Sequence, residues 1–177
     1  MTPDADADED IVWTGKFLTA RKRGRWEYVS RTGGVKAAVI LAIDDDHVIL
    51  VDQYRVPLGR ICLELPAGLV GDDDAGESVA TAAARELEEE TGYRAASIEP
   101  IGDFHSSPGM VSECFSLVRA TGLTRVGDGG GVEGEGITVH RVPLASIASY
   151  VEARRNAGMA IDVKLLLLLG AGILSHP

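Results

Sequence analysis

The sequence predicts one α/β domain, in which a mixed β-sheet forms the middle layer of a three-layer α/β/α sandwich. Two observations indicate this fold class. Short apolar runs of the kind that form strands stand before and after one amphipathic helical segment at residues 78–91, and further helical patterns follow the last run. The chain has 177 residues, of which 25% are charged, so its size and composition suit one domain with a hydrophobic core.

The N-terminal region is expected to add a β segment to this domain. Residues 1–10 are acidic and contain no apolar core, so we expect a disordered tail and neither a signal peptide nor a membrane span. The single domain then covers residues 11–177, with strands over residues 11–32.

Strands are predicted on both sides of the central helix. Residues 35–43 and 47–54 predict a hairpin, because the three aspartates at 44–46 are a turn signal between two apolar runs. The other runs that predict strands are residues 61–65, 98–101, 112–120 and 137–142.

The central helix is predicted from its apolar spacing and its stop signal. Val79, Ala83 and Leu87 recur every four residues, which gives this segment one apolar stripe, and Gly92 is a natural helix end.

Two more helices are expected near the C-terminus. One covers residues 144–156 and stops before Gly158, and the next follows an Asp162 cap. The apolar stretch at residues 165–174 is only ten residues long, about half of a membrane span, so we interpret it as a core helix.

The end of the central helix carries a concentration of charge. Residues 85–90 contain five ionised side chains. Glu86 and Glu90 lie one turn apart on the same face, where like charges repel by roughly 0.2 to 0.5 kcal/mol, and carboxylates in a last turn also oppose the helix dipole. A divalent cation between them reverses both penalties, and oxygen ligands favour Mg²⁺ or Mn²⁺ over zinc. The alternative is a solvated acidic helix end.

A longer pattern surrounds this cluster. It runs Gly71-x5-Glu77-x7-Arg85-Glu86-Leu87-x-Glu89-Glu90-x-Gly92-Tyr93. This pattern resembles the complete Nudix box, with nine matching positions over 23 residues. The resemblance implies the Nudix fold and hydrolysis of a nucleoside diphosphate linked to another group, with Mg²⁺ held by the box glutamates.

The resemblance also assigns roles within the box. It implies that Glu86 and Glu90 are the main metal ligands. Glu89 is a catalytic candidate close to the metal, or it pairs with Arg85 four residues earlier, and this structural role is the favoured one.

Two segments before the box resemble the ADP-ribose pyrophosphatase subfamily. Residues 64–68, Glu-Leu-Pro-Ala-Gly, resemble its entry into the box, which implies a metal-binding carbonyl at Ala67 or Gly68. Residues 53–57 resemble a segment whose arginine contacts substrate phosphate, and the guanidinium of Arg55 can match phosphate bidentately. The alternatives are an ordinary turn and a plain surface arginine.

A loop after the box extends the resemblance. Residues 106–113 resemble the Ser-Pro-Gly loop of the ADP-ribose hydrolases, and Pro108 stands sixteen residues beyond the box glycine, Gly92. The resemblance implies that Pro108, Gly109 and Glu113 bind substrate. As bare residues, they are a turn and a surface charge.

A glycine-rich loop at residues 127–136 contains Glu133 and Glu135. Family members carry a catalytic or metal-binding glutamate in this loop, and glycine gives it freedom to move over the diphosphate. We expect Glu135 to be the general base or a late metal ligand, with Glu133 as the second candidate.

The N-terminal segment is the expected determinant of substrate choice. Residues 26–32 resemble the part of ADP-sugar hydrolases that stacks the purine, so Trp26 is a candidate partner of adenine and Phe17 a weaker one. An alternative of equal weight is that Trp26 caps a hairpin and packs against the core. In relatives this segment crosses to the second subunit, which implies a homodimer with shared sites.

The sequence departs from the subfamily at the start of the box. Eight residues separate Gly68 from Glu77, three more than in most ADP-ribose hydrolases, and Gly71 restores the usual spacing. The enlarged loop contains three aspartates at 72–74, which we expect to be solvated.

Composition restricts the partners and the location. The formal charge of −10 at pH 7 argues against a nucleic-acid partner. Cys62 and Cys114 lack metal-ligand spacing, so both are expected to be buried reduced thiols in a cytoplasmic protein. We therefore expect a small-molecule substrate, with no nucleic acid and no membrane as partner.

These segments together predict Mg²⁺-dependent hydrolysis of ADP-ribose or a related nucleoside diphosphate sugar, giving AMP and ribose 5-phosphate. Two alternatives stay open. GDP-mannose or another nucleotide sugar would use the same scaffold. A non-catalytic Nudix-fold nucleotide sensor would bind without turnover, although such sensors usually lack box glutamates, which are all present here.

Overall fold

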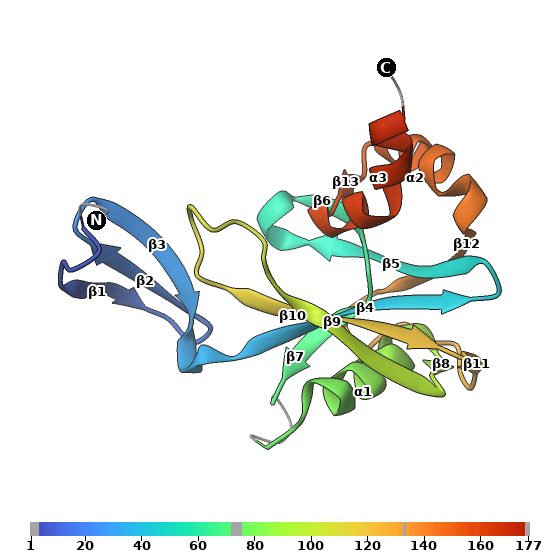
Figure 1. Cartoon of the computed structure of the whole chain (residues 1–177), viewed down its shortest axis with the longest axis horizontal. Coiled ribbons are helices and arrows are strands. Elements are labelled where there is room, and N and C mark those ends of the chain that lie inside the picture. Colours follow the sequence, from blue (N-terminus) through green and yellow to red (C-terminus); the bar gives the residue numbers. More distant parts are fainter. Residues whose placement is uncertain (1–3, 72–75, 133, 176–177) are drawn as a thin grey trace.

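The computed structural model describes residues 4–71, 76–132 and 134–175, which form a three-layer domain with a small N-terminal sheet beside it (Figure 1). The central sheet lies between the helix α1 (Val79–Thr91) on one face and the helices α2 (Ile147–Asn156) and α3 (Leu166–Ser175) on the other. The predicted α/β/α sandwich is confirmed.

The N-terminal sheet consists of three antiparallel strands: β1 (Glu9–Thr14), β2 (Leu18–Arg23) and β3 (Trp26–Arg31). The expectation of a disordered tail through residue 10 is therefore wrong at its end, because Glu9 and Asp10 lie in β1. The Glu9 carboxylate accepts hydrogen bonds from Arg21, Arg23 and Tyr28, and these contacts attach the start of β1 to its neighbours.

The central sheet contains eight strands: β4 (Lys36–Asp44), β5 (His47–Arg55), β6 (Arg60–Glu64), β7 (Ala67–Val70), β9 (Ser97–His105), β10 (Cys114–Thr121), β12 (Thr138–Pro143) and β13 (Ala160–Ile161). Its order is β13-β6-β5-β4-β10-β9, with β12 beside β5 and β7 beside β4. β10 is parallel to β4 and β13 is parallel to β6, whereas the other pairs are antiparallel, so the sheet is mixed as predicted. Two short strands, β8 (Tyr93–Arg94) and β11 (Thr124–Arg125), pair separately.

Two hydrophobic clusters cover the two faces of the sheet. Successive side chains of a strand point to opposite faces. Val39 of β4 accordingly packs in the cluster that includes Val151 of α2, and Ile40 packs in the cluster that includes Leu87 of α1. These four side chains are at most 1% exposed, and burying each one stabilises the fold by roughly 1.5 to 3 kcal/mol.

α1 has the ends that its sequence predicts. The Ser78 hydroxyl accepts the Thr81 N–H at 3.1 Å, and Gly92 follows the helix with a φ of 72°, a left-handed conformation that favours glycine. Ala83 and Leu87 of the predicted apolar stripe are buried, so this stripe faces the sheet. The register of α1 then fixes where its acidic residues point.

The C-terminal helices differ in detail from the prediction. A 3-10 turn at Leu144–Ser146 precedes α2, and a second 3-10 turn at Val163–Leu165 precedes α3. Asp162 is a cap, as predicted. Leu166 and Leu167 are 49% and 52% exposed, so only part of the predicted core helix is buried. Within the described ranges, no helix combines the length and the apolar character that a bilayer crossing requires.

β7 is a strand where the sequence indicates only a turn. Its partner is β4, with Ala67 opposite Val39, so a distant segment rather than local strand propensity makes it a strand. The expectation that both cysteines are buried is partly wrong. Cys62 is a buried thiol, but Cys114 is only half-buried at the start of β10.

Candidate active site

A cavity of about 550 Å³ lies among β4, β5, β6, β7, β10 and the C-terminal half of α1. Its polar side chains are Arg31, Gln53, Arg55, Glu64, Glu86, Glu90, Ser106, Glu113, Glu135, Asp162 and Lys164. Six of these side chains are carboxylates and three are cations, so the lining is acidic. An anionic ligand would need additional positive charge to bind here.

Glu86, Glu90 and Glu135 form what we call the acidic wall of this cavity. Glu90 is 6% exposed, and its carboxylate accepts the Ala67 N–H at 3.0 Å. Burial is the main cause that raises the pKa of Glu90 to about 8; the Ala67 N–H opposes this effect, and the charges of Glu86 and Glu135 add to it. Burial also raises the pKa of Glu86. The surroundings therefore disfavour the charged forms of Glu86 and Glu90.

Gly68 allows the acidic wall to pack against β7. A Cβ atom at this position would lie 1.8 Å from Cδ of Glu86, so the Glu86 side chain would have to move. Glycine lets the Glu86 carboxyl group lie directly over the backbone of β7. The close approach also places Glu86 and Ala67 in the lining of the same cavity.

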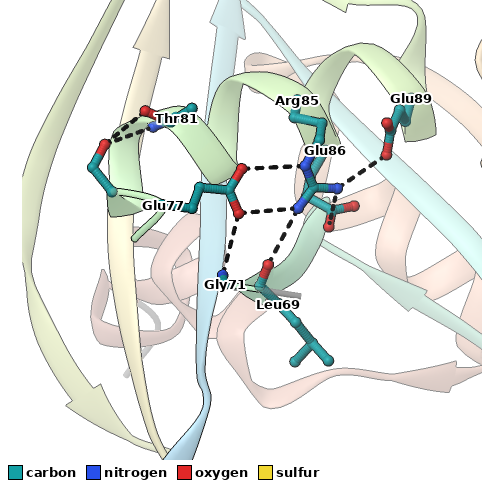
Figure 2. A network of polar contacts seen from close by, with 8 residues as sticks. Leu69, Gly71, Glu77, Thr81, Arg85, Glu86 and Glu89 are labelled. Atoms are coloured by element: carbon teal, nitrogen blue, oxygen red, sulfur yellow. Dashed lines mark hydrogen bonds and ion pairs between the residues drawn. The ribbon is translucent and has the colours of Figure 1, made fainter. Parts of the chain in front are cut away.

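Arg85 connects β7, the strand that leads into the Nudix-box pattern, to the acidic wall (Figure 2). Its guanidinium donates to Glu86 at 2.9 Å, to Glu89 at 3.2 Å, to Glu77 at 3.3 and 3.4 Å, and to the Leu69 carbonyl at 3.3 Å. The hydrogen bonds with Glu77 are the main cause that raises the pKa of Arg85. The ion pair between Arg85 and Glu89 is present, and the Glu89 side chain is 42% exposed. Glu89 therefore supports Arg85 from outside the cavity lining.

Glu77 fixes the start of the box. Its carboxylate accepts the Gly71 N–H at 3.2 Å in addition to the bonds from Arg85. The glycine and the first glutamate of the motif are thus in direct contact. The aspartates at 72–74, which we expect to be solvated, lie outside the described residues.

Each cationic side chain of the cavity is paired with a carboxylate. The three cavity ion pairs are Arg31 with Glu113, Arg55 with Glu64, and Lys164 with Asp162. Arg55 donates from Nε and Nη2 to the two oxygens of Glu64 at 2.6 and 2.8 Å, and this bidentate contact is the main cause that raises the pKa of Arg55. Arg55, the arginine expected to contact substrate phosphate, therefore already holds Glu64 with two of its three nitrogens.

Glu135 reaches the cavity from the glycine-rich loop. Its Oε2 atom accepts the Val132 N–H at 3.0 Å, which ties the carboxylate to its own loop. Glu133 lies outside the described residues. Among the residues that are described, no three acidic, histidine or cysteine side chains form a ready-made metal cluster.

A second pocket, of about 350 Å³, brings Trp26 together with Pro108 and Gly109. Two backbone hydrogen bonds of 3.0 Å attach the loop at residues 106–113, which contains Pro108 and Gly109, to β3. Glu113 instead lines the central cavity. Phe17 is 65% exposed, and Nζ of Lys16 lies 4.9 Å from its ring centroid. Sequence-predicted site residues are thus divided between two neighbouring pockets and the outer surface.

The NUDIX domain model matches residues 34–157 of this chain. The chain belongs to the Nudix family. An ADP-ribose pyrophosphatase of Bacillus subtilis is 36% identical to it over 150 residues, which cover 83% of this chain and 78% of that protein. A GDP-mannose pyrophosphatase of Cronobacter sakazakii is 32% identical over 156 residues, which cover 83% and 76% of the two chains.

A solved structure supports the same assignment. The crystal structure of an ADP compounds hydrolase matches this chain with a TM-score of 0.70 and 27% identity, over 94% of this chain and 91% of that one. The recognition of the Nudix box, of the fold and of a Nudix hydrolase is therefore confirmed.

The donors of this Nudix site suit a hard divalent cation. The cavity side chains of the described residues include carboxylates but neither histidine nor cysteine. Carboxylate oxygens and backbone carbonyls are the protein ligands of Mg²⁺, which also keeps water or phosphate oxygens in its shell. The raised pKa values of Glu86 and Glu90 fit such a site, because a cation would compensate their charge.

Several cavity residues are not predicted from the sequence. Glu64 is 5% exposed and stands within the apolar run at residues 61–65. A charged residue inside such a run is a signal that could have identified it. Asp162 is predicted only as a helix cap. Arg31 lies in the segment at residues 26–32 but is not predicted as a site residue, and Lys164 belongs to no motif, so the folded chain alone brings both to the cavity.

Proposed function

We propose that this Nudix hydrolase cleaves the diphosphate linkage of ADP-ribose or a related nucleoside diphosphate sugar, giving AMP and ribose 5-phosphate. The observation that carries the proposal is the acidic wall, which faces one cavity together with three ion pairs. The resemblance to an ADP-ribose pyrophosphatase and to an ADP compounds hydrolase supports an adenosine-containing substrate.

Mg²⁺, or Mn²⁺ in its place, would be held by Glu86, Glu90 and the Ala67 carbonyl, and when bound it neutralises phosphate charge and acidifies a water molecule. Glu135 lines the same cavity, and we assign it the removal of a proton from the attacking water, with Glu133 as second candidate. The water oxygen forms a bond to one phosphorus, and the bridging oxygen leaves with the other phosphate.

Arg55 positions the diphosphate in this proposal. It donates to Glu64 through Nε and Nη2, so Nη1 remains, among the described contacts, for a phosphate oxygen. The bidentate pair holds the guanidinium in one orientation, which lowers the entropy lost when phosphate binds. Glu64 is therefore a positioning residue.

The base is proposed to bind beside Trp26. Pro108 and Gly109 line the same pocket, which is about 350 Å³ in volume and suits a planar ring better than the polar central cavity does. Glu113 holds Arg31 in the lining of the central cavity. Phe17 remains a weaker candidate, because it lies on the exposed surface.

The N-terminal sheet is the proposed dimer interface of this single-domain chain. Ile11, Val12 and Trp13 of β1 are 62%, 66% and 59% exposed, and an apolar patch of this kind marks an interaction surface. A homodimer would cover it and bring a second copy close to Trp26. The two free thiols support a cytoplasmic location. Light scattering measures the oligomeric state in solution directly, and Trp13→Glu should shift the protein from dimer to monomer.

Purified protein incubated with ADP-ribose and Mg²⁺ tests the reaction, with AMP and ribose 5-phosphate separated by chromatography. GDP-mannose, the substrate named for one relative, is assayed beside it. Faster release of GMP than of AMP would favour that alternative. Tight binding of ADP-ribose without turnover, in Mg²⁺ and in Mn²⁺, would instead identify a nucleotide sensor.

A further inference from the structure

The loop after β13 supplies a part of the cavity that the Nudix box does not explain. Asp162, Val163 and Lys164 line the same cavity as the acidic wall. The Asp162 N–H donates to the Leu63 carbonyl at 3.0 Å, which attaches this loop beside β6. A segment close to the C-terminus therefore forms a fixed part of the cavity lining.

The loop does not need the Lys164 ammonium to keep its shape. Asp162 Oδ1 accepts the Lys164 backbone N–H at 2.8 Å, and the Asp162 carbonyl accepts the Leu165 N–H at 3.1 Å. Leu165 is fully buried and anchors the turn in the core. Lys164 takes part in these contacts through its backbone N–H alone, and its side chain is not involved.

The Lys164 side chain is nevertheless held in one place. It is 18% exposed, its Nζ lies 2.7 Å from Oδ2 of Asp162, and the same atom lies 5.7 Å from the ring centroid of Phe115. Partial burial of such a pair carries a desolvation cost that the turn does not require. Within the described part of the chain, Asp162 is the hydrogen-bond acceptor of Nζ, so two of its three N–H groups remain for a ligand.

The position of Lys164 along the cavity identifies which part of a substrate it meets. Phe115 and Glu113 are two residues apart and both line the cavity, so roughly 7 Å separates them along the extended chain. The Glu113 end carries Arg31 and adjoins the loop whose Pro108 lies beside Trp26. The Phe115 end carries Lys164. A substrate with its base near Trp26 would extend along this cavity toward Lys164.

We propose that Lys164 and Asp162 bind the hydroxyl groups of the sugar on the non-nucleotide side of the diphosphate. The inference rests on the proposed function. The ammonium donates to a hydroxyl oxygen, the carboxylate accepts a hydroxyl hydrogen, and Phe115 offers an apolar surface. A lysine paired with an aspartate is neutral as a unit, which suits a neutral polyol better than an additional phosphate. This pair would therefore select among nucleotide sugars.

The test compares two substrates in the full-length protein. One is ADP-ribose, and the other is ADP whose second phosphate carries a methyl ester in place of the sugar. Lys164→Met should lower kcat/KM for ADP-ribose about tenfold more than for the methyl ester, the factor expected for one hydrogen bond to a charged group. Asp162→Asn keeps an oxygen for the cap and should shift selectivity in the same direction.

Lys36→Met is the matched control, because it removes one positive charge from an exposed lysine that is paired with Asp103. It should leave the ratio of the two substrates unchanged. Equal losses for both substrates in Lys164→Met would overturn the inference and indicate a structural or long-range electrostatic role.

Calorimetric titration with ribose 5-phosphate separates this inference from the proposed function, because it needs no turnover. Binding to the wild-type protein that Lys164→Met weakens about tenfold would support the sugar site even if no nucleotide sugar were hydrolysed. Absence of binding to the wild-type protein, or equal binding to both proteins, would refute it.

Discussion

The acidic wall and the three ion pairs occupy the same cavity but differ in how their charge is balanced. Arg31, Arg55 and Lys164 each have a carboxylate within hydrogen-bonding distance. Glu90 instead has a backbone N–H and two like charges as neighbours, and its pKa is raised to about 8. The pairs are balanced without a ligand, whereas we expect the wall to be stabilised when a cation binds. The comparison separates the residues proposed to position a substrate from the residues proposed to hold a metal.

Glu90→Gln should break this comparison most strongly. The change removes the charge that a metal requires and keeps the side-chain shape, so we expect turnover of ADP-ribose to fall by about 10² to 10³. Glu88→Gln is the control, because Glu88 lies on the same helix but pairs with exposed Arg94 at 2.8 Å. Full activity in Glu90→Gln would show that the acidic wall is not the catalytic centre.

Arg85→Lys should have the next largest effect. Lysine is a point charge and cannot hold three carboxylates and a carbonyl in one plane, so Glu86 would lose its orientation. We expect kcat to fall by about 10 to 100 with a smaller change in KM. Arg94→Lys, at an exposed ion pair, provides the control. Similar kinetics in both variants would argue against a positioning role.

Gly68→Ala tests the close packing of the wall on β7. The added methyl group would meet the Glu86 carboxyl group, and we expect the free energy of unfolding to fall by about 1 to 3 kcal/mol. Chemical denaturation measures this change. Gly170→Ala is matched, because a Cβ atom there has no neighbour within 4 Å. A loss of the same size in both variants would contradict the packing argument.

The stability of the metal-free protein should depend on pH through Glu90. Its folded pKa of about 8 lies above the ordinary 4.5, so the folded state holds the proton more tightly than the unfolded state. The contribution of Glu90 to stability is fully present below pH 4.5 and is lost as the pH rises toward 8, by at most about 1.4 kcal/mol per pH unit. Denaturation in chelator should show this slope, and Glu90→Gln should reduce it. An unchanged slope would mean that other groups cause it.

Much of the fold follows from local pattern. The stripe of α1, its Ser78 cap and its Gly92 end are properties of adjacent residues, and the structure has them at the predicted places. The hairpin of β4 and β5 is equally local, because its turn signal stands between its strands. β7 is different: its strand geometry depends on pairing with β4, which no local propensity encodes.

The candidate site divides in the same way. Glu86 and Glu90 are identifiable because helical spacing puts them on one face, and Arg85 and Glu89 pair for the same reason. The bidentate contact of Arg55 with Glu64 is not visible in the sequence, because the register puts Arg55 opposite Arg60 and Glu64 opposite Val51, and the two side chains meet only by reaching along the neighbouring strands β5 and β6.

The sequence by itself determined the family, the acidic helix end and the expectation of a hard metal, because these depend on residues within one box and on the periodicity of one helix. Only the tertiary structure decided which cations are paired, that the Glu86 carboxyl group packs over Gly68, and that Asp162 and Lys164 join the cavity. Those properties depend on contacts between segments that are distant in the chain. Their geometry is set by strand pairing and core packing, which leave no signal in the local sequence.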